Sequence, residues 1–173
     1  MEIKKFRLLF DKDVEQDWLN EMCRNGWALK NFCLGVYTFE SCDPGQYTYQ
    51  IDLLPGSGVK PSDHDGYAEF MEETGIQVVC RWFRWIILRK PTADGPFEIY
   101  SDLDSQIEMY SRIRAMFIWG LAIELCCSFS IWSNLHRDVF MYLLALLYLF
   151  IFATFLRAII TTNRKIRDLA SKK

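Results

Sequence analysis

The chain has 173 residues, of which 51% are apolar and 24% are charged, and this length excludes a protein of two large domains. Its mean hydropathy of +0.00 conceals an uneven distribution, since residues 1–114 carry 13 basic and 19 acidic residues, whereas residues 115–173 carry 7 and 3. The acidic first part argues against direct binding of nucleic acid, and the apolar second part predicts contact with a lipid bilayer.

The first hundred residues alternate between segments typical of strands and segments typical of helices. Runs rich in β-branched and aromatic residues predict five strands, at 3–10, 27–40, 46–54, 76–88 and 97–100. Amphipathic spacing predicts helices at 13–25 and 62–74, each followed by a glycine. Between the second and third strands, Pro44 and Gly45 suit a type II turn, which predicts a hairpin. The order predicts an α+β fold, a ferredoxin-like split βαβ antiparallel sheet with an extra strand.

The strand predicted at 46–54 shows the clearest alternation of apolar and polar residues. Its odd-numbered positions from 47 to 53 are apolar or aromatic, whereas Thr48, Gln50 and Asp52 are polar. Because successive side chains of a strand point to opposite faces, we expect one buried face and one face in contact with water.

The strand predicted at 76–88 is apolar on both faces, and helices on one side of a sheet cover only one of them. The second face carries Val79, Phe83, Trp85 and Ile87. Exposed apolar patches are typical of binding surfaces, so these four residues are predicted to bind a partner subunit, a ligand or the membrane surface. The alternative is that loops and a third helix cover them.

Two long apolar runs follow a third amphipathic segment. Glu124 is the only charged residue of the first run, and Arg157 is the only one of the second. A membrane-spanning helix needs about 20 such residues, so both runs predict transmembrane helices, and no helix breaker separates the first run from the segment before it. The predicted division is a domain at 1–101, a helical stalk at 102–114, transmembrane helices at 115–132 and 139–160 with an outer turn at 133–138, and a basic tail at 161–173. A buried two-helix core is the alternative, but residues 1–114 offer no large apolar surface to cover both runs.

Basic residues gather at the ends of the two runs that are remote from the connecting turn. Arg112 and Arg114 precede the first run, and the tail after the second run is basic, whereas the turn contains Arg137 alone. Because lysine and arginine are retained in the cytoplasm during insertion, both termini are expected to be cytoplasmic. The protein is therefore predicted to be a two-span membrane protein.

Glu124 lies within the first predicted span, where a carboxylate costs on the order of 3 kcal/mol. We expect its carboxyl group to be protonated or hydrogen-bonded against the second span or another protomer. Ion conduction is the alternative, although two spans with one ionisable group offer no pathway.

Motifs that support catalysis or metal binding are absent from the sequence. It contains no G-x-S-x-G, no glycine-rich phosphate loop and no C-x-x-C pair. Asp63, His64 and Asp65 resemble metal ligands, but they lie at a predicted helix start, where aspartates cap backbone N–H groups. We therefore predict no catalytic residue, cofactor or metal, and expect that the chain is not an enzyme.

Several motifs of the first domain resemble a known family. The sequence reads W-L-N-x-M-x-x-x-G-W-x-L from Trp18, then Y-x-F from Tyr37, then P-G-x-Y-x-Y-x-x-D from Pro44. These residues resemble the bacterial family called domain of unknown function 2812, over about residues 1–110. One departure is Ile76, where the family commonly has tryptophan after glycine.

The resemblance implies a cytoplasmic domain that is commonly followed by membrane helices and often encoded beside PadR-type transcription regulators. It implies no activity, so no catalytic residue is carried over. We expect a membrane-anchored regulator or sensor whose cytoplasmic domain binds a cytoplasmic or membrane protein, with a homo-oligomer as a further option. The alternative is an accessory subunit of a membrane transporter complex.

Overall fold

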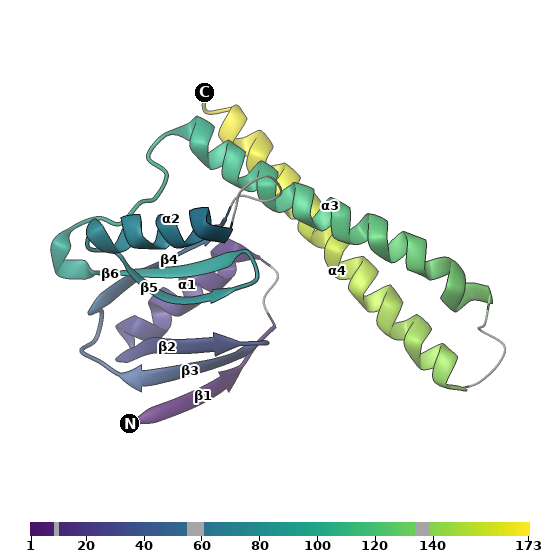
Figure 1. Ribbon diagram of the computed structural model, residues 1–173, viewed down its shortest axis with the longest axis horizontal. Helices are drawn as coiled ribbons and strands as arrows, with labels where there is room; N and C mark the ends of the chain where they lie inside the picture. The colour runs from purple at the N-terminus through teal and green to yellow at the C-terminus, as the bar shows by residue number, and fades with distance from the viewer. Residues whose placement is uncertain (9–10, 55–60, 134–138) are drawn as a thin grey trace. The chain divides into compact units, whose positions relative to one another are not determined.

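The computed structural model describes residues 1–8, 11–54, 61–133 and 139–173 (Figure 1). These residues form two compact units, Met1–Ser101 and Asp102–Lys173. The first unit contains all the strands of the described residues, and the second consists of two long helices.

The first unit has two antiparallel sheets of three strands each. Its elements are β1 (Glu2–Phe6), α1 (Lys12–Arg24), β2 (Trp27–Cys33), β3 (Val36–Ser41), β4 (Tyr47–Leu53), α2 (Pro61–Glu73), β5 (Gln77–Trp82), β6 (Trp85–Pro91) and the short 3₁₀ helix η1 (Thr92–Asp94). The first sheet has the strand order β1-β3-β2, and the second sheet has the order β4-β6-β5. The predicted antiparallel α+β class is therefore confirmed.

The two sheets belong to two copies of one βαββ arrangement. α1 begins at Lys12 and α2 begins at Pro61, and both helices have 13 residues. The β2–β3 hairpin shifts register between Leu29 and Asn31, and the β5–β6 hairpin does so between Val78 and Cys80. The two helix starts are 49 residues apart, and so are the two register shifts. The first unit is thus a tandem pair of modules with the same strand order and the same bulge.

Three strand predictions are wrong, two of them because they miss where the chain reverses. The segments 27–40 and 76–88 are each a hairpin with a two-residue turn, and 97–100 is not a strand. Leu34 and Phe83 open these turns with φ of 47° and 56°, a conformation in which glycine or asparagine is usual. A single ferredoxin-like sheet is therefore replaced by two sheets.

The predicted turn at Pro44 and Gly45 exists, but it does not close a hairpin. Gln46 N donates to Asp43 O at 3.0 Å, and Gly45 has a φ of 73°. Because β3 and β4 belong to different sheets, this turn connects the two modules.

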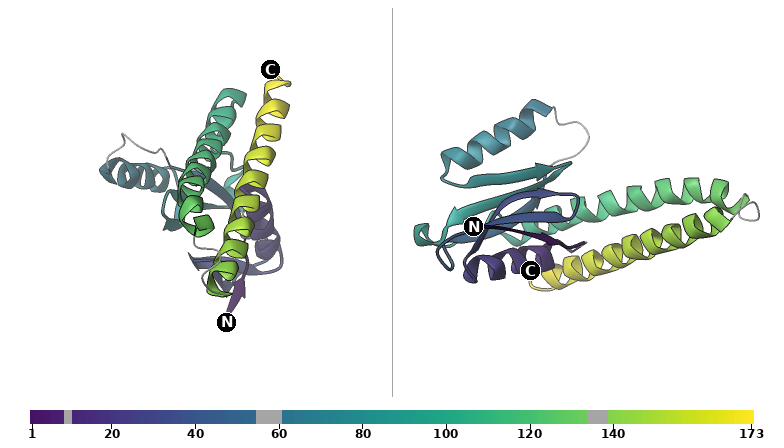
Figure 2. Two further views of the ribbon diagram at one scale, coloured as in Figure 1. Left: turned by 90° about the vertical axis from the view of Figure 1, so that its right-hand side faces the viewer. Right: turned by 90° about the horizontal axis from the view of Figure 1, so that it is seen from below.

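The first core cluster lies between α1 and the facing sides of the two sheets. Its buried members are Leu19, Met22, Cys23, Leu29, Tyr37, Phe39, Tyr49, Ile51 and Ile87. A second core cluster lies on the other side of the second sheet, where Leu54, Met71, Ile86, Leu88 and Phe97 pack together. Figures 1 and 2 show α1 and α2 on opposite sides of the second sheet, which is therefore buried on both faces.

Side chains of α1 occupy the edge of β4 that does not pair with β6. Three backbone N–H groups of β4 donate to side chains of α1. Tyr47 N donates to Cys23 Sγ at 3.3 Å, Tyr49 N to Asn20 Oδ1 at 2.8 Å, and Ile51 N to Gln16 Oε1 at 3.2 Å. Asn20 Nδ2 also donates to Tyr49 O at 3.1 Å. Every second N–H group along this edge of β4 is therefore hydrogen-bonded to a residue of α1, and successive residues of α1 in this set are three or four positions apart. These bonds satisfy a sheet edge that would otherwise lack partners.

The second unit is an antiparallel pair of helices, α3 (Leu103–Ser133) and α4 (Val139–Ala170), which run side by side in Figures 1 and 2. The rings of Phe117 and Phe155 lie 5.7 Å apart. A Cβ at Gly120 would lie 2.8 Å from the Phe155 ring, so this glycine permits the close approach of the helices. Arg114 Nη1 donates to Asn163 Oδ1 at 3.1 Å nearer the helix ends.

The predicted unbroken helix from residue 102 to residue 132 is confirmed within one residue at each end. Among the described residues, α4 is the one helix that is long and apolar enough to cross a membrane by length and composition. Of the two predicted membrane spans, the structure therefore supports one. Most of the predicted outer turn at 133–138 lies outside the described residues.

Candidate functional site

The most unusual polar group of the first unit is the carboxylate of Asp52, which is 2% exposed. Tyr67 Oη donates to its Oδ2 at 3.0 Å, and Tyr100 Oη lies 2.9 Å from both oxygens. Leu53 N donates to Oδ1 at 2.7 Å. Three donors thus replace the water that a buried carboxylate loses. We refer to Asp52, Tyr67 and Tyr100 as the carboxylate clamp.

The clamp joins three segments that are distant in sequence. Asp52 stands on β4 opposite Ile86 and faces the second core cluster, Tyr67 comes from α2, and Tyr100 comes from residues 95–100, which we call the strap. Phe97 of the strap is buried in that cluster, and its carbonyl accepts a hydrogen bond from Gln50 Nε2 at 2.5 Å. The clamp therefore holds the last residues of the first unit against the second sheet.

Sequence reasoning missed this site because it placed Asp52 and Gln50 on a face in contact with water. The alternation of β4 is as predicted, but α2 and the strap cover the face on which Asp52 lies. The sequence does contain a signal for this site. Asp52 is an acidic residue between two apolar residues of a strand, and the two tyrosines that could donate to it, Tyr67 and Tyr100, follow later in the chain. Both oxygens of the carboxylate accept bonds from hydroxyls, an arrangement that suits holding segments together rather than accepting a substrate proton.

A second buried polar group connects α1 with the first sheet. Tyr37 Oη donates to Glu15 Oε1 at 2.7 Å. Burial raises the pKa of Glu15, and burial together with the nearby Glu15 carboxyl raises the pKa of Tyr37. Burial also raises the pKa of the Cys80 thiol to about 12, which favours the protonated thiol at neutral pH.

The four residues predicted to bind a partner do not share one exposed face. Phe83 is 79% exposed at the β5–β6 turn, whereas Ile87 is 3% exposed within the first core cluster. Val79 and Trp85 are half-buried against the same cluster. The face on which a partner is predicted to bind packs instead against α1 and the first sheet of the same unit, and the strand ends before the turn at Phe83.

Glu124 lies on α3, and both of its carboxyl oxygens are shielded from solvent without a hydrogen-bond partner in the described part of the chain. The side chains of Asp63, His64 and Asp65 lie outside the described residues. Within the described residues, no three histidine, cysteine, aspartate or glutamate side chains form a group able to hold a metal ion.

Comparison with known proteins identifies one family. The model of the family described as protein of unknown function DUF2812 matches residues 11–122. This range includes the strap and the first part of α3. No curated protein and no solved structure matches the chain.

Proposed function

We propose that this chain, which belongs to the DUF2812 family of proteins of unknown function, is a membrane-anchored regulatory or sensor protein. In this proposal the second unit crosses the bilayer twice, both termini are cytoplasmic, and the first unit binds a protein partner in the cytoplasm. The resemblance to a family often encoded beside PadR-type transcription regulators makes such a regulator the first partner to test.

The pairing of α3 with α4 supports two spans. If α4 crosses a bilayer, the part of α3 that packs on it enters the bilayer too, and Gly120 meets Phe155 at this contact. The outward side chains of this part of α3 are apolar as well, since Ile118, Trp119 and Ile123 are exposed. Apolar side chains on the outside of a helix pair suit a lipid environment.

The observation that carries the sensor proposal is the carboxylate clamp. Tyr100 precedes the first residue of α3 by three positions, and its hydroxyl is bonded to a buried carboxylate of β4. A change in the position of α3 is therefore transmitted to the second sheet and to α2 unless the clamp opens. Regulation by such a device requires two states of one element, and the strap, held or released, is the element we propose.

The partner surface that we propose is on α2. Glu69, Glu72 and Glu73 are exposed there, and so is Phe70, which is 57% exposed. An aromatic side chain among carboxylates suits a basic protein, and proteins that bind DNA are basic.

The proposal is tested by affinity purification of the full-length protein from native membranes. We expect capture of a cytoplasmic protein that is lost in a Phe70→Ala, Glu72→Lys variant. Asp17→Lys, the same charge change at an exposed position of α1, is the matched control and should retain capture. Equal capture by both variants would move the partner surface away from α2.

The proposed topology is tested separately by cysteine labelling of intact cells. A reagent that does not cross the membrane should label a cysteine placed at Asn134 and should miss one placed at Ser171. The reverse pattern would refute the orientation.

Glu124 favours a second candidate function, an accessory subunit of a membrane transporter complex. A carboxyl group shielded from solvent without a partner in the described residues is satisfied by a contact inside the membrane, from another protein or a second copy of the chain. This candidate predicts that only integral membrane proteins are captured. Glu124→Gln should then retain their capture and Glu124→Leu should lose it, because the amide can still form hydrogen bonds.

A further inference from the structure

One end of the first unit exposes a group of large apolar side chains, which we call the tip patch. Of the nine large apolar side chains that the described part of the first unit exposes, six belong to this group. They are Phe6, Leu8, Leu34, Val36, Trp82 and Phe83, with exposures from 38% for Val36 to 79% for Phe83. They come from the end of β1 and from the turns of the two hairpins.

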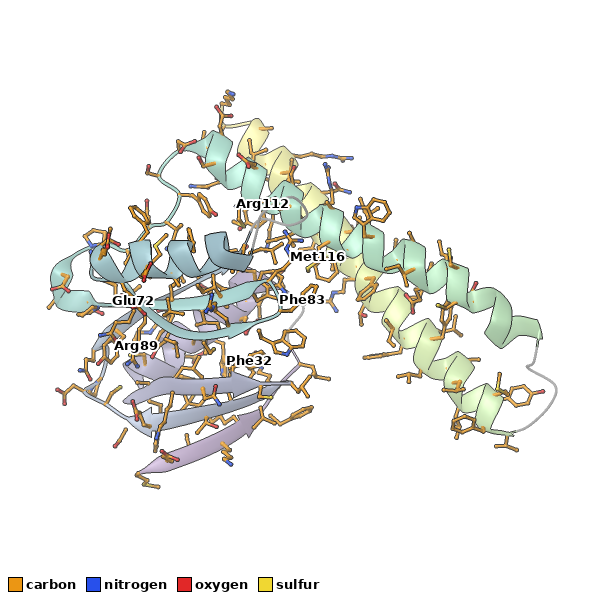
Figure 3. All side chains as sticks on the ribbon, viewed as in Figure 1. Phe32, Glu72, Phe83, Arg89, Arg112 and Met116 are labelled. Carbon is orange, nitrogen blue, oxygen red and sulfur yellow. The ribbon has the colours of Figure 1, made fainter. Side chains whose placement is uncertain are left out.

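Contacts within the first unit connect these residues. Phe6 pairs with Val36 in the first sheet, and a Cβ on Gly35 would lie 3.0 Å from Leu8 Cδ2 and 3.2 Å from Phe6 Cε2. The ring of Trp82 packs edge-on against Phe32 at 6.0 Å, which joins the two hairpins. Figure 3 shows Phe32 and Phe83 at the same end of the sheets, and Glu72 and Arg89 away from it.

The three segments that form the tip patch are basic, although the unit as a whole is acidic. Residues 1–101 contain 11 basic and 16 acidic residues. The three segments that form the tip, 4–8, 30–36 and 81–84, contain six of the basic residues and no acidic residue. The tip segments therefore carry a net positive charge beside the patch, even though Lys30 pairs with Glu2.

The backbone at both turns accommodates these apolar side chains at a cost. Leu34 and Phe83 have positive φ, a conformation that is unfavourable for a residue with a Cβ and that asparagine or glycine adopts more easily. The same disfavoured choice at corresponding positions of the two modules indicates that the apolar side chains are needed at the tip, and folding of the turns alone does not require them.

From this combination we propose that the tip patch docks on the anionic lipid surface of the membrane, with its apolar side chains inserted at the headgroup level. Aromatic side chains flanked by lysine and arginine suit this interface, where anionic lipids attract the charges and the acyl boundary takes up the rings. The proposal rests on the membrane anchorage proposed above, which holds the unit near the bilayer.

The tether length permits this docking. The part of α3 before residue 115 has 12 residues and spans about 18 Å as a helix, and a strand of seven residues, such as β4, spans roughly 23 Å. The stalk is thus shorter than one such strand, so its length does not keep the first unit out of reach of the headgroups. The partner surface on α2 lies outside the tip patch, so docking leaves it available.

The test uses the full-length protein in vesicles, with an environment-sensitive NBD fluorophore on Cys33. This exposed cysteine ends β2 beside Leu34. Cys42, Cys80, Cys126 and Cys127 are replaced by alanine, so that the other remaining cysteine is the buried Cys23. The control carries the fluorophore on a Glu72→Cys substitution in a Cys33→Ala background. Vesicles contain either phosphatidylcholine alone or phosphatidylcholine with phosphatidylglycerol, each with a nitroxide-headgroup lipid as quencher.

We expect quenching at position 33 in the phosphatidylglycerol vesicles, little in phosphatidylcholine alone, and none at position 72 in either. The double variant Leu34→Asn, Phe83→Asn should lose the quenching, and it suits the positive φ at both turns, so a folding defect is not the cause. Lys4→Gln should weaken docking about fivefold, whereas Arg24→Gln, which removes the charge of an exposed basic residue outside the tip segments, should not.

Three results would overturn the proposal. The first is equal quenching at positions 33 and 72, and the second is quenching that the asparagine variant retains. The third is a fluorophore at position 33 that is shielded from water in native membranes but is not quenched by the nitroxide lipid in vesicles. In that case a protein, and not lipid, would cover the tip patch. Carbonate extraction tests the membrane anchorage separately. If carbonate removes the protein from the membrane while the fluorophore at position 33 is still quenched, the anchorage is refuted and the docking of the tip patch is supported.

Discussion

Replacing Tyr100 by phenylalanine removes one hydroxyl from the carboxylate clamp and keeps the ring in place. The Asp52 carboxylate is 2% exposed, so water cannot replace the lost donor without opening the site, while Tyr67 and Leu53 N continue to donate. A hydrogen bond to a charged group contributes about 1.5–3 kcal/mol. Since each 1.4 kcal/mol is a factor of ten, release of the strap should become about 10- to 150-fold more frequent.

Proteolysis measures this release directly. Glu98 is an exposed residue of the strap, and a glutamate-specific protease cleaves after it when the strap detaches. When opening and closing are fast relative to cleavage, the cleavage rate follows the population of the open form, so it should rise by the same factor in Tyr100→Phe. Tyr47→Phe, which removes a hydroxyl that accepts a bond from Gln46 at an exposed site, should leave the rate unchanged. A Tyr100→Phe rate within twofold of wild type would show that the hydroxyl does not hold the strap.

Three further predictions concern the stability of the first unit, measured by urea unfolding of the full-length protein. Gly35→Ala should lower the midpoint more than Gly45→Ala, because both have positive φ but only Gly35 has neighbours within 4 Å of a new Cβ; equal losses would contradict the close packing. Asn20→Ala should cost about 2–4 kcal/mol by leaving Tyr49 N and O without their partner, and a loss well under 1 kcal/mol would show that water replaces it. Glu15 has a raised pKa, so its contribution to stability is complete below its unfolded pKa and is lost as the pH rises through its folded pKa; Glu15→Gln should remove this fall, and a slope that persists would assign it to other groups.

The sequence predicts local structure well where a helix pattern has clear ends. The helix predicted at 13–25 is observed at Lys12–Arg24, and the absence of a breaker before Ala115 correctly predicts one continuous helix. The strands at 27–40 and 76–88 are predicted without their turns, because Leu34 and Phe83 interrupt neither the apolar run nor the β-branched composition. Residues that adopt a disfavoured φ give no turn signal of their own.

The site is less predictable than the fold, because it depends on which surfaces meet. The alternation of β4 assigns Asp52 to one face but does not reveal that α2 and the strap cover it. Tyr100 contacts Asp52 across 48 residues, a separation that no local pattern encodes. Ile87 shows the opposite case, since it lies on the face predicted to bind a partner and is buried against the first sheet and α1.

The division of the first core cluster between the two modules has a consequence for synthesis on the ribosome. Tyr37 and Phe39 of the first module are buried in one cluster with Tyr49, Ile51 and Ile87 of the second, so the first module cannot complete its own core. The first core cluster therefore forms only after β6 has left the ribosome, and the second core cluster also needs Phe97 of the strap. At about 5–20 residues per second, synthesis of the chain beyond β6 takes roughly 4–16 s, so most of the first unit can fold before the synthesis of α4 is complete.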